Sequence, residues 1–222
     1  MRRPLFRDRR DAGKRLAAAL QRYARRPNLL VLALPRGGVP VAFEVANALD
    51  AQLDVFLVRK LGVPGHEELA MGAIASGDVQ VLNDDIVRAI GATPAMIDRV
   101  ATTEWRELER RERSYRGSRP RPDVREKTVI LVDDGLATGA TMRAAAAALR
   151  SQQPSRLIVG VPVAAPTTCD EFRAEVDEIV CAETPEPFYG VGAWYEDFSP
   201  TTEEEVRTLL DSADEAARGA GG

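Results

Sequence analysis

The chain has little of what zinc proteins, secreted proteins and membrane proteins require. Its only cysteines are Cys169 and Cys181, with no Cys-x-x-Cys pair, so we expect two buried, reduced thiols and no zinc site. No apolar run is long enough to span a bilayer, and the N-terminal arginines are not followed by the apolar segment of a signal peptide. These absences predict a cytoplasmic protein without membrane contact.

Charge is distributed unevenly along the chain. The formal net charge of -4 argues against a general binder of polyanions, so a nucleic-acid partner is not expected. Residues 1–26, however, contain many basic side chains and only two acidic ones, Asp8 and Asp11. These cations are Arg2, Arg3, Arg7, Arg9, Arg10, Lys14, Arg15, Arg22, Arg25 and Arg26. We interpret the stretch as a solvated basic helix, with an anion-facing surface as the alternative.

Apolar runs of strand length alternate with helical patterns over most of the chain. The runs are rich in β-branched residues and do not alternate with polar ones, which is typical of parallel strands covered on both faces. Strands are predicted at Leu29–Leu34, Leu53–Val58, Val129–Val132, Leu157–Val163 and Val176–Cys181. Helices are predicted at 8–25, 40–49 and 141–149, and from Pro166 onwards. The expected fold class is α/β, a doubly wound parallel sheet flanked by helices.

Two segments extend this core, and we treat 1–222 as a single domain that includes both. Residues 84–122 contain two helical patterns and are more than the core requires, so we expect a helical insertion that forms a cap or a dimer contact. A hairpin is predicted before it, around Gly77-Asp78.

The second extension is the C-terminal segment 183–222. It contains an aromatic cluster made of Phe188, Tyr189, Trp194, Tyr195 and Phe198. We expect these rings to pack over the core, while a hood that stacks on a base is the alternative.

The stretch Thr128–Thr141, TVILVDDGLATGAT, combines the features of a sugar-phosphate site. A buried strand leads directly into Asp133 and Asp134, and then through Thr138-Gly139 into a helix. Backbone N–H groups at the start of a helix can hold a phosphate. The two carboxylates beside them could hold sugar hydroxyls or a metal, so the stretch predicts a site for a phosphorylated sugar.

Two other stretches place cations after predicted strands. The strand at Leu29–Leu34 ends at Pro35–Gly38, where paired glycines allow close backbone approach and Arg36 offers a guanidinium suited to phosphate. Arg59 and Lys60 follow the next strand, and ligands bind at the carboxyl ends of parallel strands. We predict that these cations bind a diphosphate together, the alternatives being a structural tight turn and a solvated basic turn.

The polar, glycine-rich residues 61–69 are predicted to form a mobile loop that closes over the site and excludes water. The loop contains Glu67 and the only histidine, His66. A catalytic or phosphate-contacting histidine is one hypothesis, and a solvent-exposed loop residue is the favoured one.

Val129–Thr141 resembles the phosphoribosyl-pyrophosphate (PRPP) motif of type I phosphoribosyltransferases, where four apolar and two acidic residues precede a Thr-Gly-x-Thr phosphate loop. The other motifs follow the same order along the chain as in that family. Arg36–Gly38 corresponds to the pyrophosphate loop, and Arg59 and Lys60 come directly before the flexible loop. The resemblance spans about Leu29–Val163. Leu34–Val41 and Val58–Gly65 further resemble an uncharacterised bacterial branch of predicted phosphoribosyltransferases, whose acceptor is unknown.

The resemblance implies a role for each matching residue. Asp133 and Asp134 would accept hydrogen bonds from the ribose 2- and 3-hydroxyls, and residues 137–141 would wrap the 5-phosphate. Arg36 and Gly37 would meet the pyrophosphate across a strained or cis peptide, with Lys60 nearby. The implied PRPP contacts are Arg36, Gly37, Gly38, Arg59, Lys60, Asp133, Asp134, Gly135, Ala137, Thr138, Gly139, Ala140 and Thr141. Among them, Arg36, Lys60, Asp133 and Asp134 would be catalytic.

The implied reaction is Mg²⁺-dependent transfer of phosphoribose to a nitrogenous base, with release of pyrophosphate, in a homodimer. Mg²⁺ would be held through the ligand rather than in a protein cage, with Asp133 and Asp134 as candidate contacts. Ala137 stands where enzymes for 6-oxopurines usually have an aspartate, so the loop is nearer to the adenine and orotate enzymes.

Two other functions compete with this one. One is a PRPP-binding regulator of nucleotide metabolism that binds nucleic acid through the basic N-terminal helix and the Arg-rich helix near Glu104–Arg113, although the net negative charge argues against it. The other is a competence-type helper of nucleic-acid uptake, which usually has an N-terminal zinc-binding cysteine cluster that this chain lacks.

Overall fold

The computed structural model describes residues 4–117 and 119–219 and contains two separate sheets. The larger is five-stranded and entirely parallel, in the order β2-β1-β6-β7-β8. Its strands are β1 (Leu29–Ala33), β2 (Gln52–Val55), β6 (Thr128–Val132), β7 (Arg156–Val163) and β8 (Glu178–Glu183). The predicted parallel sheet is thus confirmed. Arg2 and Arg3 of the basic stretch, and the last residues of the C-terminal extension, lie outside the described residues.

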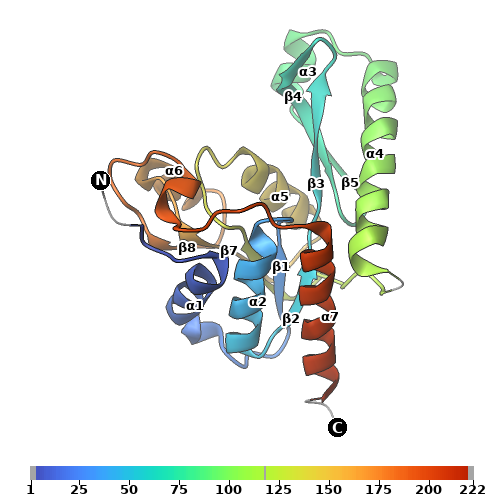
Figure 1. Cartoon of the computed structure of the whole chain (residues 1–222). Helices are drawn as coiled ribbons and strands as arrows, with labels where there is room; N and C mark the ends of the chain where they lie inside the picture. The colour runs from blue at the N-terminus through green and yellow to red at the C-terminus, as the bar shows by residue number, and fades with distance from the viewer. Residues whose placement is uncertain (1–3, 118, 220–222) are drawn as a thin grey trace.

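Helices cover both faces of this sheet (Figure 1). The helices on one face are α1 (Arg9–Ala19), α2 (Gly38–Leu49) and α7 (Glu203–Gly219), and those on the other are α5 (Ala140–Ser151) and α6 (Pro166–Phe172). Alternate residues of β1 serve the two cores: Val31 packs on the first side and Leu32 on the second. This two-sided burial is why the strands read as continuous apolar runs.

A second unit, which we call the arm (residues 58–116), stands out from the body of the molecule (Figure 1). It contains an antiparallel sheet of β3 (Val58–Val63), β4 (His66–Ala75) and β5 (Val79–Leu82), with helices α3 (Asp84–Ala89) and α4 (Pro94–Arg116). The predicted hairpin at Gly77-Asp78 is present, and both turn residues have positive φ. None of the helices in the described ranges is long and apolar enough to cross a membrane.

The arm corrects two predictions. The strand expected to run to Val58 ends at Val55, so Arg59 and Lys60 lie inside β3 of the arm rather than at the edge of the main sheet. The prediction that residues 61–69 form a mobile loop is also wrong about their secondary structure, because β3 and β4 continue through most of this stretch. Leu61 and Val63 are buried on β3. Because these apolar side chains pack into the core, the β3–β4 pairing continues through a stretch whose other residues are mostly polar.

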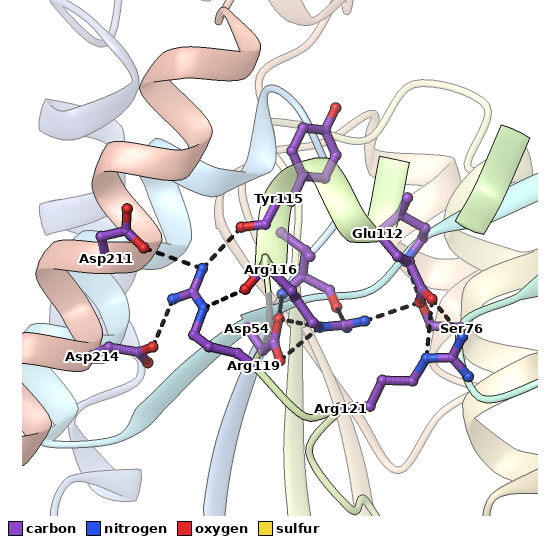
Figure 2. Close-up of polar contacts among 11 residues, drawn as sticks. Asp54, Ser76, Glu112, Tyr115, Arg116, Arg119, Arg121, Asp211 and Asp214 are labelled. Atoms are coloured by element: carbon purple, nitrogen blue, oxygen red, sulfur yellow. Dashed lines mark hydrogen bonds and ion pairs between the residues drawn. The ribbon is translucent and has the colours of Figure 1, made fainter. Parts of the chain in front are cut away.

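The arm is attached to the body through a charged cluster, the junction, drawn in Figure 2. Arg116, at the end of α4, donates from Nε to both carboxylate oxygens of Asp54 on β2, at 2.9 and 3.0 Å. Its other nitrogens donate to Glu112 and to the carbonyl of Val55. Ser76 also donates to Glu112. The junction therefore fixes the base of α4 to both sheets.

Two cysteines predicted to be reduced thiols form a disulfide bond instead, between Cys169 on α6 and Cys181 on β8. The prediction is wrong because α6 turns back over the sheet and places its residues against the strand that follows it, with the two Cα atoms 6.8 Å apart. Spacing along the chain gave no sign of this proximity.

The C-terminal extension packs over the core, as favoured from its composition. Trp194 and Tyr195, at the end of the short helix η2 (Val191–Trp194), are buried against Phe6. Tyr189 is 76% exposed, and Phe198 is exposed at 36%. A short helix η1 (Gln21–Tyr23) continues α1, in place of the single longer helix predicted there.

Candidate functional site

Two loops meet at the carboxyl ends of the neighbouring strands β1 and β6. Gly37 lies against Asp134, and a Cβ atom added at Gly37 would stand 2.1 Å from Asp134 Oδ2. A Cβ at Gly38 would meet the carbonyl oxygen of Val132 at 2.8 Å. Any side chain at either position would therefore push the loops apart. Sequence reasoning placed both loops at a site, and the structure brings them into direct contact.

Asp133 and Asp134, the acidic pair, each have one carboxylate oxygen paired and one open. Asp133 Oδ1 accepts from the Asp134 backbone N–H at 2.8 Å, and Asp134 Oδ2 accepts from Arg9 Nε at 2.8 Å. The other two oxygens accept no hydrogen bond from the described residues, and neither is among the fully buried unpaired atoms. Two acceptors are thus available to a ligand.

The acidic pair is held in a poorly solvated position. Burial raises the pKa of Asp133 well above its ordinary value, and the charge of Asp134 raises it further. Burial also raises the pKa of Asp134, against the lowering effect of the hydrogen bond and charge of Arg9. A buried pair of like charges is therefore stabilised by one nearby cation.

Arg9 and Tyr195 are site residues that sequence reasoning missed. Arg9 belongs to α1, and its role was hidden among the other cations of the basic stretch. Tyr195 donates its hydroxyl proton to the carbonyl oxygen of Asp134 at 2.5 Å, and burial raises the pKa of this hydroxyl, which keeps it a donor. The one available signal was that Tyr195 belongs to the aromatic cluster.

The loop predicted to hold a phosphate, residues 137–141, connects the acidic pair to α5. Gly139 adopts a positive φ of 75° immediately before α5 and is packed against Phe172 of α6. The carbonyls of Ala137 and Thr138 accept hydrogen bonds from Thr168 at 2.6 Å and Arg143 at 2.7 Å. The first turn of α5 leaves N–H groups without helical acceptors, and such groups suit an anion. Gly135 precedes this loop and packs against Val191.

The predicted cations are not gathered at one place. Arg36 is exposed and follows a cis peptide bond from Pro35, and its side chain makes no hydrogen bond or ion pair within the described ranges. Arg59 is paired with Glu104 of α4 at 2.5 Å, and Lys60 lies 3.8 Å from Glu68. Across residues 4–117 and 119–219, no ion pair joins Arg59 or Lys60 to the acidic pair.

Arg59 and Lys60 instead line a cavity of about 630 Å³ between β3 and α4. Glu67 also lines this cavity, and His66 and Glu67 are both exposed at the start of β4 near the tip of the hairpin. The arm does approach the glycine loop (Pro35–Gly38) at its base, where burial raises the pKa of Tyr115 and the Arg36 charge partly offsets that effect. Of the three predicted cations, Arg36 belongs to the loop that contacts the acidic pair, because the next residue, Gly37, lies against Asp134.

Comparison with known proteins identifies relatives along most of the chain. A family model described as the phosphoribosyl transferase domain matches residues 7–193. Two proteins of Mycobacterium tuberculosis, from strains CDC 1551 / Oshkosh and ATCC 25618 / H37Rv, carry the provisional name phosphoribosyl transferase. Each is 44% identical to this chain over 209 residues, covering 94% of this chain and 47% of the relative. The chain thus spans about half the length of the curated relatives that it matches.

A solved structure is similarly close. The crystal structure of TT1426 from Thermus thermophilus is 43% identical in sequence and matches with a TM-score of 0.83. The match covers 92% of this chain and 97% of that chain, so both the main sheet and the arm fall within it.

Proposed function

Because the chain belongs to the phosphoribosyl transferase family, we propose that it uses PRPP and Mg²⁺ to transfer phosphoribose to a nitrogenous base. The observation that carries this proposal is the placement of two open carboxylate oxygens between a phosphate loop and a glycine loop with a free arginine side chain. Ribose hydroxyls, a 5-phosphate and a diphosphate would occupy these three parts respectively. PRPP carries all three groups in one molecule.

The residues present also fit a ligand-held Mg²⁺ ion. Within the described residues, no group of three or more His, Cys, Asp or Glu side chains could hold a metal by itself. Mg²⁺ commonly takes one or two carboxylates and completes its shell with phosphate oxygens and water. The open oxygens of Asp133 and Asp134 would supply such contacts, and a bound ion would neutralise part of the diphosphate charge.

The chemistry follows from where the charges lie. The bond between the anomeric carbon and pyrophosphate breaks with its electron pair leaving on the pyrophosphate oxygen, so positive charge develops on the sugar ring. The acidic pair stabilises that charge, while Arg36 and the amides of the glycine loop stabilise the departing diphosphate. The acceptor nitrogen then supplies the electron pair of the new bond from the opposite face of the ring, and any proton that this nitrogen carried passes to solvent.

The test is pyrophosphate release from PRPP and Mg²⁺ in the presence of a panel of purine and pyrimidine bases. Release that depends on one base would identify the acceptor. The double substitution Asp133→Asn with Asp134→Asn removes both charges and keeps the side-chain shapes, and we expect it to lower turnover by at least about a hundredfold. Circular dichroism should show an unchanged fold.

A matched control is available in the adjacent aspartates Asp84 and Asp85, which are exposed on α3 of the arm. Asp84→Asn with Asp85→Asn makes the same chemical change away from the site and should leave turnover unchanged. Full activity in the Asp133/Asp134 double variant would contradict the site assignment. Tight PRPP binding without release against any base would favour the regulator over the enzyme.

A further inference from the structure

Helix α1 delivers one guanidinium to the acidic pair from 125 residues away in sequence. The Arg9 side chain is only 11% exposed. Its Nε donates to Asp134 Oδ2 at 2.8 Å, and its other end donates to the carbonyl oxygen of Ser199 at 2.7 Å. The guanidinium carbon lies 4.0 Å from the centre of the Phe198 ring. Arg9 is therefore held on three sides.

The glycine loop packs closely against the same carboxylate oxygen of Asp134 that Arg9 contacts. The position of a Cβ at Gly37 falls 2.1 Å from Asp134 Oδ2 and 3.3 Å from Arg9 Nε. The backbone of Asp134 is fixed as well, because its carbonyl accepts from Tyr195. Arg9 and Gly37 therefore both contact Oδ2, while Oδ1 accepts no hydrogen bond from the described residues.

We infer that Arg9 is a positioning residue of the site, which locks the Asp134 carboxylate so that its free oxygen meets a ribose hydroxyl of PRPP. This inference rests on the proposed function. A planar guanidinium that donates from two nitrogens defines an orientation that a rotating ammonium does not. The C-terminal extension takes part through Phe198 and Ser199, which hold Arg9 in turn.

The neighbouring arginine shows that this arrangement is particular to Arg9. Arg10 projects from the same turn of α1 but pairs with Glu44, and its side chain is 59% exposed. Within the part of the chain that the structure describes, it makes no hydrogen bond or ion pair with the acidic pair. Arg10 therefore serves as a matched control for the loss of one cation from α1.

The test is a double-mutant cycle on the dissociation constant of Mg²⁺–PRPP, measured by calorimetry. We expect Arg9→Met to weaken binding about tenfold in the wild-type background, because the Asp134 carboxylate is then free to turn. In the Asp134→Asn background the same substitution should change the constant less than about twofold, since the group that Arg9 positions is already altered. Arg10→Met should stay within about twofold of wild type.

Each outcome decides something. Equal effects of Arg9→Met in the two backgrounds would show that Arg9 acts on the fold in general, and would overturn the inference while leaving the proposed function intact. Wild-type protein that binds no PRPP would overturn the proposed function and this inference with it. Should Arg9→Met fail to fold, Arg9→Lys takes its place in the same cycle, because it keeps the charge and loses the two-nitrogen geometry.

Discussion

The acidic pair and the junction both set carboxylates against arginine, but they differ in how completely the carboxylate oxygens are paired. In the junction, all four oxygens of Asp54 and Glu112 accept hydrogen bonds, from Arg116, Arg121, Ser76 and a backbone amide. In the acidic pair, two of the four oxygens accept no hydrogen bond from the residues that the structure describes. Fully paired buried charges hold a structure in one arrangement, whereas open ones retain the capacity to bind.

This difference separates two tasks. The junction fixes α4 to β2, to the β4–β5 turn and, through Arg119 and Asp214, to α7 (Figure 2). The acidic pair is instead supported by one cation and left open toward the glycine loop. Substitutions in the junction should therefore affect mainly the free energy of unfolding, and substitutions in the acidic pair mainly ligand binding.

Removing the central arginine of the junction should give the largest change in stability. Arg116→Met leaves Asp54 and Glu112 buried without their shared cation, and we expect the free energy of unfolding to fall by about 3–5 kcal/mol. Urea denaturation measures it. Arg113→Met is the control on the same helix, since the Arg113 side chain is 70% exposed, and it should change stability by at most about 0.5 kcal/mol. Similar values for the two variants would contradict the structural role of the junction.

Loss of the disulfide bond between Cys169 and Cys181, which lies close to residues 137–141, should cause the next largest change in stability. Replacing both cysteines, Cys169→Ser with Cys181→Ser, releases a short closed loop, and we expect a loss of about 3 kcal/mol. Wild-type protein in dithiothreitol should reach the same stability as the variant, and the variant should not respond to the reductant. A wild-type protein that is unaffected by reduction would show that the bond does not contribute to stability.

The pH dependence of the free energy of unfolding should be the smallest of these effects. It should also distinguish the acidic pair most clearly from the junction. Burial raises the pKa of Asp133, so the folded state keeps a proton that the unfolded state has lost. The contribution of Asp133 to the free energy of unfolding is therefore most favourable below its unfolded-state pKa of about 3.9. It is lost as the pH rises through the raised pKa of the folded state.

Asp133→Asn removes this titration, so the variant should gain stability relative to wild type as pH rises from about 4 to about 8. Urea denaturation of both proteins across that range, without Mg²⁺, measures the difference. A variant that instead loses stability with rising pH would mean that the Asp133 charge supports the fold, as the junction charges do.

Local pattern was sufficient for most of the secondary structure. The apolar strand before Asp133, the helix after Gly139 and the turn at Gly77-Asp78 were all predicted, because each depends on neighbours in sequence. Arg59 and Lys60 were placed wrongly, since nothing local indicates that the strand ends at Val55 and that a second sheet begins three residues later.

The order of residues along the chain was enough to predict the parallel α/β fold, and that the acidic pair and residues 137–141 lie between a buried strand and a helix. Burial periodicity and the Asp-Asp and Thr-Gly spacing are properties of contiguous residues. Packing in three dimensions was needed to show that Arg9 supports Asp134, that Cys169 meets Cys181, and that α4 is fixed by Asp54. These contacts join residues from separate elements, and their partners are chosen by how helices and strands pack rather than by any local pattern.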